Sequence, residues 1–250
     1  MNKLLHFASI AIALGVTTTV CASPTHTPTI KNVVLVHGAF ADGSGWIAVA
    51  NILRKDGFTV SVVQPPETSL EDDVAATTRA IDAMGGPVVL VGHSYGGVII
   101  TTAGNNERVK SLVYVAAFQP DTGENLGSLA ASKPPTSPSP IPSPDGFLYI
   151  GQATFHSDFC ADLPALQAEF MAQSQVGLAI KAAGAATTTP AWKAKPSYAI
   201  VATNDHAINP DLERFMYKRA GSTVTELASS HAVYISHPAE VAAVIERAAQ

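Results

Sequence analysis

Short apolar runs alternate with amphipathic stretches along most of the chain. Asn32–Val36 is rich in valine and is followed by Gly38, which is typical of a buried strand. Three further runs of this kind occur at Thr59–Val63, Pro87–Val91 and Lys110–Ala116. Segments with helical periodicity separate them, so the pattern predicts parallel strands in one sheet with helices on both faces.

The expected helices between these strands have recognisable ends. Ser69 is a predicted N-cap, and the acidic residues Glu71–Asp73 would fill the first turn, where they suit the helix dipole. This helix would run to about Met84. The alternation then returns near the end of the chain, where two strands and two helices are expected at Ser197–Ala202, Pro210–Ala220, Thr223–Leu227 and Pro238–Ala249.

Residues 117–195, which we call the cap segment, do not continue this alternation. Proline occupies almost every second position of Lys133–Asp145, which excludes a helix or a central strand there. Helices are expected at Asp162–Ala172 and Val176–Ala183. Because helices with apolar faces need a surface to pack on, we expect an insertion that covers a site, and a surface linker is the alternative.

The first residues have the layout of a secretory signal peptide. Lys3 precedes an apolar run, Leu4–Val16, and small residues surround a cleavage point after Ala22. A membrane anchor or an N-terminal core helix is the alternative, but the run is shorter than the roughly 20 residues that a membrane-spanning helix needs. A lipoprotein signal is a further alternative because of Cys21. We therefore expect residues 1–22 to be removed and a single mature domain, residues 23–250, to be exported to the periplasm or beyond.

Composition limits the classes of function. Of the 250 residues, 47% are hydrophobic and 14% are charged, and the formal net charge is −5. The chain has no block of lysine and arginine, so a nucleic-acid-binding surface is not expected. Removal of the leader would leave Cys160 as the one cysteine, so no intramolecular disulfide is expected.

The segment Gly92–Gly97 (GHSYGG) contains the pattern G-x-S-x-G between an expected strand and an expected helix. A nucleophilic serine in such a turn projects above the sheet, and glycines two positions away relieve the crowding around it. Ser94 is therefore the candidate nucleophile. An ordinary glycine-rich turn is the alternative.

A serine hydroxyl needs a general base, and the base needs a carboxylate that orients it. His231 follows the last expected strand, and Asp205 follows the strand before it. The order Ser94, Asp205, His231 is that of an α/β-hydrolase triad. Asp121, which follows the fourth strand, is the alternative acid.

Two backbone N–H groups should stabilise the negative charge that develops on the substrate oxygen. The N–H of Tyr95, next to the nucleophile, is one candidate donor. The second is Ala39, in the loop after the first strand, where His37 and Gly38 would shape the turn.

Together, these motifs resemble the α/β-hydrolase superfamily, and within it small bacterial carboxylesterases related to the plant methyl-esterase and hydroxynitrile-lyase branch. The resemblance covers about residues 30–249 and implies an α/β-hydrolase fold with a mostly parallel sheet and a cap insertion. Lyases of that branch carry a lysine beside the catalytic histidine and a glutamate before the serine. Ala232 and His93 stand at those positions here, which favours ester hydrolysis.

We thus expect a serine carboxylesterase that acts on a small-molecule ester and needs neither metal nor organic cofactor. A lyase, amidase or perhydrolase on the same fold, and a binding protein without turnover, are the alternatives. Oligomeric state and the identity of the ester are left open. Apolar side chains of the cap segment would line the substrate pocket or form the core of the cap: Phe147, Leu148, Tyr149, Phe155, Phe159, Leu163 and Phe170.

Overall fold

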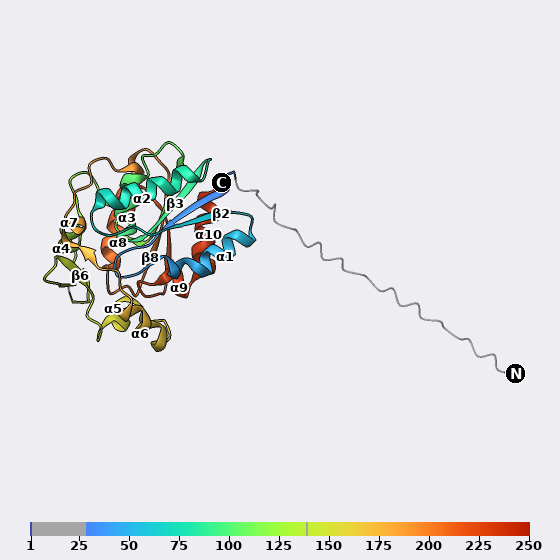
Figure 1. Ribbon diagram of the computed structural model, residues 1–250. Coiled ribbons are helices and arrows are strands. Elements are labelled where there is room, and N and C mark those ends of the chain that lie inside the picture. Colours follow the sequence, from blue (N-terminus) through green and yellow to red (C-terminus); the bar gives the residue numbers. More distant parts are fainter. Residues whose placement is uncertain (2–28, 139) are drawn as a thin grey trace.

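A six-stranded sheet lies at the centre of the computed structural model, which describes Met1, residues 29–138 and residues 140–250. Its strand order is β2-β1-β3-β4-β8-β9, and all neighbouring strands run parallel (Figure 1). The parallel α/β fold expected from the apolar runs is confirmed. The strands are β1 (Asn32–Val36), β2 (Thr59–Val63), β3 (Val88–Ser94), β4 (Val109–Ala117), β8 (Ser197–Ala202) and β9 (Thr223–Leu227).

The place of a strand in the sheet follows from its apolar content. Every residue of the central strand β3 is buried, because helices cover both of its faces. The edge strand β9 has no fully buried residue and carries Glu226 on an exposed position. Successive residues of β1 point to opposite faces, so Val34 and Val36 join one core cluster while Val33 and Leu35 join the other.

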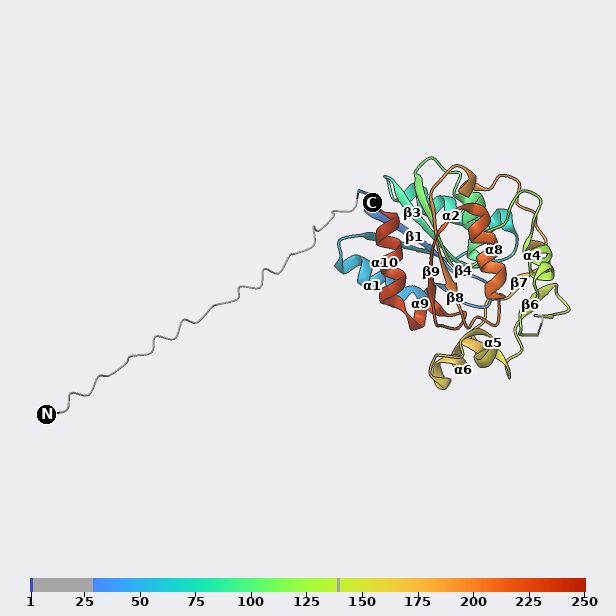
Figure 2. The same ribbon diagram turned by 180° about the vertical axis from the view of Figure 1, so that it is seen from behind.

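Helices cover both faces of the sheet (Figure 2). One face packs against α2 (Leu70–Ala83), α3 (Gly96–Ala103) and α8 (Pro210–Ala220). The other packs against α1 (Ile47–Lys55), α9 (Val233–Ser236) and α10 (Pro238–Ala248), and a short 3₁₀ turn, η1 (Gly43–Trp46), leads into α1. Ser69 caps α2 as expected, since its hydroxyl oxygen accepts the N–H of Asp72 at 3.1 Å.

The cap segment holds short elements that lie between β4 and β8 in the chain. Three of its strands form a separate antiparallel sheet in the order β5-β6-β7. The other elements of the cap segment are helical. In chain order the strands and helices of the cap segment are α4 (Leu126–Ser132), β5 (Ile141–Pro142), β6 (Phe147–Tyr149), α5 (Phe155–Phe159), α6 (Ala165–Gln173), β7 (Leu178–Ala179), α7 (Ile180–Ala183) and η2 (Ala191–Lys193).

The prediction of a helix at Val176–Ala183 is wrong for the first half of this range. Leu178–Ala179 is a strand that pairs with Phe147–Leu148 of β6, and the helix is confined to Ile180–Ala183. The partner strand lies about thirty residues earlier in the chain, so the local alanine-rich pattern contained no sign of this pairing. The expected helix at Asp162–Ala172 begins later, at Ala165, after Pro164.

The signal peptide expected at residues 1–22 lies outside the described residues. Among the helices of the part that is described, we find none with the length and apolar character that crossing a bilayer requires.

Candidate active site

Ser94 lies at a sharp turn between β3 and α3. Its φ is +53°, a left-handed backbone conformation that is unfavourable for residues other than glycine. The turn leaves no room for side chains on either side of it. A Cβ on Gly92 would lie 2.5 Å from the carbonyl oxygen of Gly96, and one on Gly96 would lie 2.7 Å from that of His37. The glycines of the G-x-S-x-G pattern are thus sterically required.

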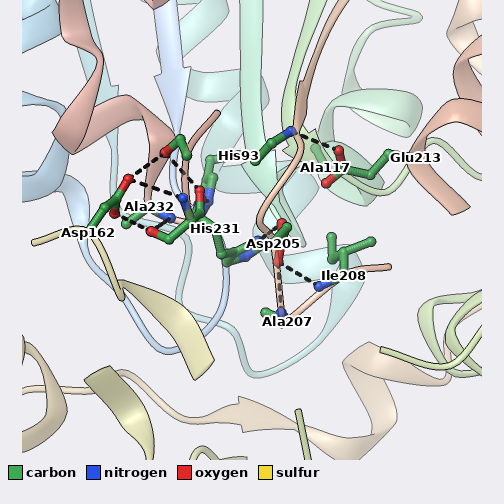
Figure 3. A network of polar contacts seen from close by, with 12 residues as sticks. His93, Ala117, Asp162, Asp205, Ala207, Ile208, Glu213, His231 and Ala232 are labelled. Atoms are coloured by element: carbon green, nitrogen blue, oxygen red, sulfur yellow. Dashed lines mark hydrogen bonds and ion pairs between the residues drawn. The ribbon is translucent and has the colours of Figure 1, made fainter. Parts of the chain in front are cut away.

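Asp205 and His231 form a buried pair in the loops that follow β8 and β9. The Asp205 Oδ2 atom lies 2.6 Å from His231 Nδ1 (Figure 3). Asp205 Oδ1 accepts the backbone N–H groups of Ala207 at 2.7 Å and Ile208 at 2.9 Å. Since a carboxylate can only accept, His231 carries its proton on Nδ1, which leaves Nε2 as the atom that can take a proton.

The structure places the other expected site residues around one cavity. Ser94 and His231 line it together with Ala39 and Tyr95, the two residues expected to supply oxyanion donors. Its volume is about 480 Å³. The nucleophile candidate, the base candidate and both donor residues thus face one space at the carboxyl edge of the sheet.

The alternative acid, Asp121, is not brought to His231. Its carboxylate forms an ion pair with Lys193, and these groups are 29% and 49% exposed. Burial opposes ionisation of Asp121, but the contact with Lys193 lowers its pKa below the ordinary value. Asp121 is therefore a surface ion-pair residue, and Asp205 is the carboxylate that contacts the histidine.

The cap segment supplies most of the apolar wall of the cavity. Of the seven cap side chains considered from the sequence, Leu148 and Phe159 line it. Phe155 and Leu163 instead pack in a buried cluster, and Phe170 is 66% exposed. Further lining comes from residues that the sequence did not single out: Phe118, Leu126, Ala130, Pro134, Pro135, Pro138, Pro140, Ile150 and Leu178.

Three further polar residues contact the Asp205–His231 pair or its loops. His93 is fully buried, and its Nε2 donates to the backbone carbonyl of His231 at 3.0 Å. Burial lowers the pKa of His93 well below its ordinary value, so the ring is neutral. Its neighbour in the sequence is Ser94, but nothing in the sequence indicated that its side chain would contact the base.

Glu213 of α8 lies buried beside Asp205. Burial, together with the nearby Asp205 carboxylate, raises the pKa of Glu213 well above its ordinary value, and its Oε2 accepts the N–H of Ala202 at 3.1 Å. Helical spacing could have revealed it. Glu213 is three and four residues before Met216 and Tyr217, which share the buried face of α8.

Asp162 of the cap segment holds the loop that carries His231. Its Oδ2 accepts the hydroxyl of Ser229 at 2.8 Å and the N–H of Ser230 at 3.1 Å, and its Oδ1 accepts the hydroxyl of Ser230 (Figure 3). Burial opposes ionisation of Asp162, but these hydrogen bonds lower its pKa below the ordinary value. The contact joins residues 67 and 68 positions apart, so no local pattern could predict it.

Within the described ranges, no three His, Cys, Asp or Glu side chains come together in a way that could hold a metal ion. Cys160, the one cysteine among the described residues, is buried and unpaired. Burial raises the pKa of its thiol to about 12, so it stays protonated.

Comparison with known proteins gives the same fold. An extracellular α/β-hydrolase from a Paenibacillus species, described as sharing structural and functional homology with tobacco salicylic acid binding protein 2, matches with a TM-score of 0.74 and 19% identity. That match covers 88% of this chain and 99% of the other. A mutant of polyneuridine aldehyde esterase matches with a TM-score of 0.75 and 17% identity, and the match again covers 88% and 99% of the two chains.

A sequence relative is closer in identity but aligns over less of the chain. The carbendazim hydrolyzing esterase of Nocardioides sp. (strain SG-4G) is 35% identical over 116 residues, which are 40% of this chain and 47% of that protein. The aligned part thus spans about half of the relative. Residues 33–244 match the Alpha/beta hydrolase family as a whole, and the chain belongs to that family, as the sequence motifs indicated.

Proposed function

We propose that the protein is a serine hydrolase that cleaves carboxylic esters through an acyl-enzyme intermediate. The observation that carries the proposal is the 2.6 Å Asp205–His231 pair at the wall of the cavity that Ser94 lines. Membership of the Alpha/beta hydrolase family and relatives named as esterases support hydrolysis as the reaction class.

In the first step, the Ser94 hydroxyl attacks the ester carbonyl carbon while His231 Nε2 takes the hydroxyl proton. Asp205 stabilises the imidazolium that forms, because its carboxylate carries the opposite charge and accepts a hydrogen bond from the N–H at Nδ1. The left-handed backbone of Ser94, with a φ of +53°, places this residue at the turn that ends β3, where it lines the cavity.

The negative charge on the tetrahedral intermediate falls on the former carbonyl oxygen. The backbone N–H groups of Ala39 and Tyr95 are the proposed donors to this oxygen. Collapse of the intermediate breaks the bond to the alcohol, which leaves with the proton from His231. A water molecule then attacks the acyl-enzyme by the same route, and the acid and free Ser94 are released.

The cavity favours an uncharged, apolar ester. Among the described residues that line it there is no Lys, Arg, Asp or Glu, and most contribute aliphatic, aromatic or proline carbon. A cyanohydrin lyase is disfavoured by Ala232 and His93, since the related lyases carry lysine and glutamate at these positions. Product analysis with matched ester, amide and cyanohydrin substrates separates these reactions.

The direct test is the Ser94→Ala variant with a short-chain aryl ester such as p-nitrophenyl butyrate. We expect turnover to fall at least about 10⁴-fold while the protein stays folded. Ser157→Ala, at a surface hydroxyl of the cap segment, is the matched control and should keep wild-type turnover. Wild-type turnover by a folded Ser94→Ala variant would show that another group performs the reaction.

Export is a separate proposal. The expected signal peptide, residues 1–22, predicts a mature chain that begins at Ser23. Expression of the full chain in a bacterium, followed by N-terminal sequencing of the protein from the periplasm and the medium, tests this. Recovery of the intact chain from the cytoplasm alone would contradict it.

A further inference from the structure

A second buried histidine–carboxylate pair lies beside the loop that carries Ala39. His37 follows β1, and Glu67 lies between β2 and α2. Their Nδ1 and Oε1 atoms are 3.5 Å apart, and the two side chains are 1% and 0% exposed. Glu67 also has a φ of +57°. Burial of the Glu67 carboxyl group and its left-handed backbone each destabilise the folded state. The proposed reaction steps give Glu67 no role.

The hydrogen-bond partners of His37 assign a proton to both ring nitrogens. Its Nε2 lies 3.0 Å from Gln64 Oε1, and the same oxygen accepts the N–H of Gly43 at 3.1 Å, which fixes the orientation of the amide. Its Nδ1 lies 3.0 Å from the carbonyl oxygen of Gly38. Because both nitrogens face acceptors, His37 is an imidazolium that donates twice.

The charge of Glu67 supports this state of His37. Burial alone would lower the pKa of His37, but the charge of the Glu67 carboxylate 3.5 Å away, together with the Gly38 and Gln64 acceptors, outweighs burial and raises the pKa above its ordinary value. With both nitrogens occupied, His37 cannot act as a general base. It serves instead as a fixed donor to the Gly38 carbonyl.

Holding the Gly38 carbonyl orients the next N–H group. The peptide bond between Gly38 and Ala39 is planar and trans, so its C=O and N–H point in opposite directions. Gly38 also lies directly against the nucleophile turn, since a Cβ there would be 2.6 Å from Ser94 Cβ and 3.0 Å from Tyr95 N. A cation on the carbonyl oxygen further polarises the peptide, which strengthens its N–H as a donor.

The same network reaches the residue of the second donor. The Tyr95 hydroxyl donates to Asp73 Oδ2 at 2.7 Å, and Asp73 Oδ1 accepts the N–H of Glu67 at 2.7 Å. Tyr95, Asp73 and Glu67 are all fully buried. A continuous set of contacts therefore runs from the Gly38 carbonyl through His37, Glu67 and Asp73 to Tyr95.

We propose that His37, Glu67 and Asp73 are positioning residues for the oxyanion hole. His37, held by Glu67, fixes the peptide that presents the Ala39 N–H, and Asp73 fixes both Glu67 and the Tyr95 side chain. The proposal rests on the proposed ester hydrolysis, because it assigns these residues to the donors of that reaction. It predicts that their loss weakens binding of the transition state more than binding of the ester.

Glu67→Gln is the first test, with p-nitrophenyl butyrate as the substrate. We expect kcat to fall roughly 10- to 100-fold with KM changed less than about threefold, because loss of a whole oxyanion donor costs about 10²- to 10³-fold. Affinity for an alkyl boronic acid, which forms a tetrahedral adduct, should fall in parallel with kcat. If Glu67 had a purely structural role, the folded fraction of the variant would keep the wild-type kcat and the wild-type affinity for the boronic acid.

Tyr95→Phe is the second test, and it decides the question if Glu67→Gln does not fold. It removes the hydrogen bond to Asp73 and should lower kcat about tenfold. Tyr114→Phe is the matched control, since Tyr114 is equally buried and its hydroxyl lies 2.9 Å from Thr101 Oγ1 on the same core. It should leave kcat and KM at their wild-type values.

The outcomes separate this proposal from the proposed function. If Ser94→Ala keeps full turnover, serine hydrolysis itself fails. If turnover depends on Ser94 but Tyr95→Phe, and Glu67→Gln where it folds, behave like Tyr114→Phe, ester hydrolysis stands and the positioning role is overturned. An effect confined to KM would also overturn it.

Discussion

Two buried histidine–carboxylate pairs lie in this site, and they differ in how the ring nitrogens are used. His231 contacts Asp205 through Nδ1 at 2.6 Å, and among the described contacts its side chain makes no other hydrogen bond. His37 places Nδ1 and Nε2 each 3.0 Å from an acceptor oxygen. The first ring keeps a nitrogen for proton exchange, whereas the second has none. A histidine–carboxylate pair can thus provide a general base at His231 and a fixed hydrogen-bond donor at His37.

The carboxylates of the two pairs differ as well. Asp205 accepts two backbone N–H groups besides His231. In the described structure, neither carboxyl oxygen of Glu67 has a hydrogen-bond partner, and its nearest opposite charge is 3.5 Å away. Burial accordingly raises the pKa of Glu67 above its ordinary value, and the charge of His37 opposes this rise and favours the ionised carboxylate. Backbone N–H groups thus orient the acid of the base pair, whereas Glu67 has His37 as its charged neighbour.

The largest expected effect comes from breaking the base pair with Asp205→Asn. An amide in place of the carboxylate can offer its NH₂ group to His231 Nδ1 and so favour the wrong tautomer. We expect kcat on p-nitrophenyl butyrate to fall about 10⁴-fold. Asp211→Asn, at a carboxylate of α8 that is 71% exposed, is the control and should not change kcat. A loss of less than tenfold for Asp205→Asn would remove Asp205 from the mechanism.

Gly38→Ala should disrupt the loop that contains His37 and the proposed oxyanion donor Ala39. The added Cβ would lie 2.6 Å from the His93 carbonyl oxygen and 2.6 Å from Ser94 Cβ, so the loop must move away from the nucleophile. We expect kcat to fall roughly 10²- to 10³-fold, as for loss of an oxyanion donor.

Gly184→Ala, at the residue that follows α7, is the control for that change, since its Cβ would have no neighbour closer than 3.4 Å and Gly184 does not line the cavity. It should keep the wild-type kcat and melting temperature. Equal turnover by Gly38→Ala and Gly184→Ala would show that the His37 loop does not contribute to transition-state binding.

A smaller effect is expected from Asp162→Asn, which weakens the link between the cap segment and the His231 loop. An amide can accept only through one oxygen, so some hydrogen bonds from Ser229 and Ser230 are lost. We expect kcat to fall about three- to tenfold, with Asp158→Asn in α5 as the control. An unchanged kcat would limit Asp162 to a structural role.

The pH dependence of stability should be the smallest of these effects. Because the folded-state pKa of Asp162 is lowered, its stabilisation is present above the unfolded pKa and is lost as pH falls through the folded value. The difference in melting temperature between wild type and Asp162→Asn should therefore be constant from about pH 5 to 7 and shrink below about pH 4. A difference that grows on acidification would contradict the sign.

The sequence was most informative for the strands of the central sheet. The strands of the central sheet are short apolar runs with clear ends, and β1, β2, β8 and β9 lie where the pattern predicted them. The cap segment was less predictable, because pairs such as Leu178 with Leu148 join distant short segments. Local periodicity cannot encode a partner that lies elsewhere in the chain.

The candidate active site likewise has residues that the sequence could predict and residues that it could not. Ser94, Asp205 and His231 could be named because each follows a predicted strand, and the fold brings the ends of parallel strands to one edge. Glu67 and Asp162 lie in loops where no spacing or motif marks them. Their importance is visible only from contacts with His37 and Ser230, and those contacts depend on how the loops pack.

Covalent labelling of the serine is the most direct test of the proposed mechanism. Wild-type protein treated with an alkyl fluorophosphonate should gain one adduct by intact mass, and peptide mapping should place it on Ser94. His231→Ala should label far more slowly, and Ser94→Ala should not label. No adduct on folded wild-type protein, or an unchanged adduct on Ser94→Ala, would contradict an acyl-enzyme mechanism at this site.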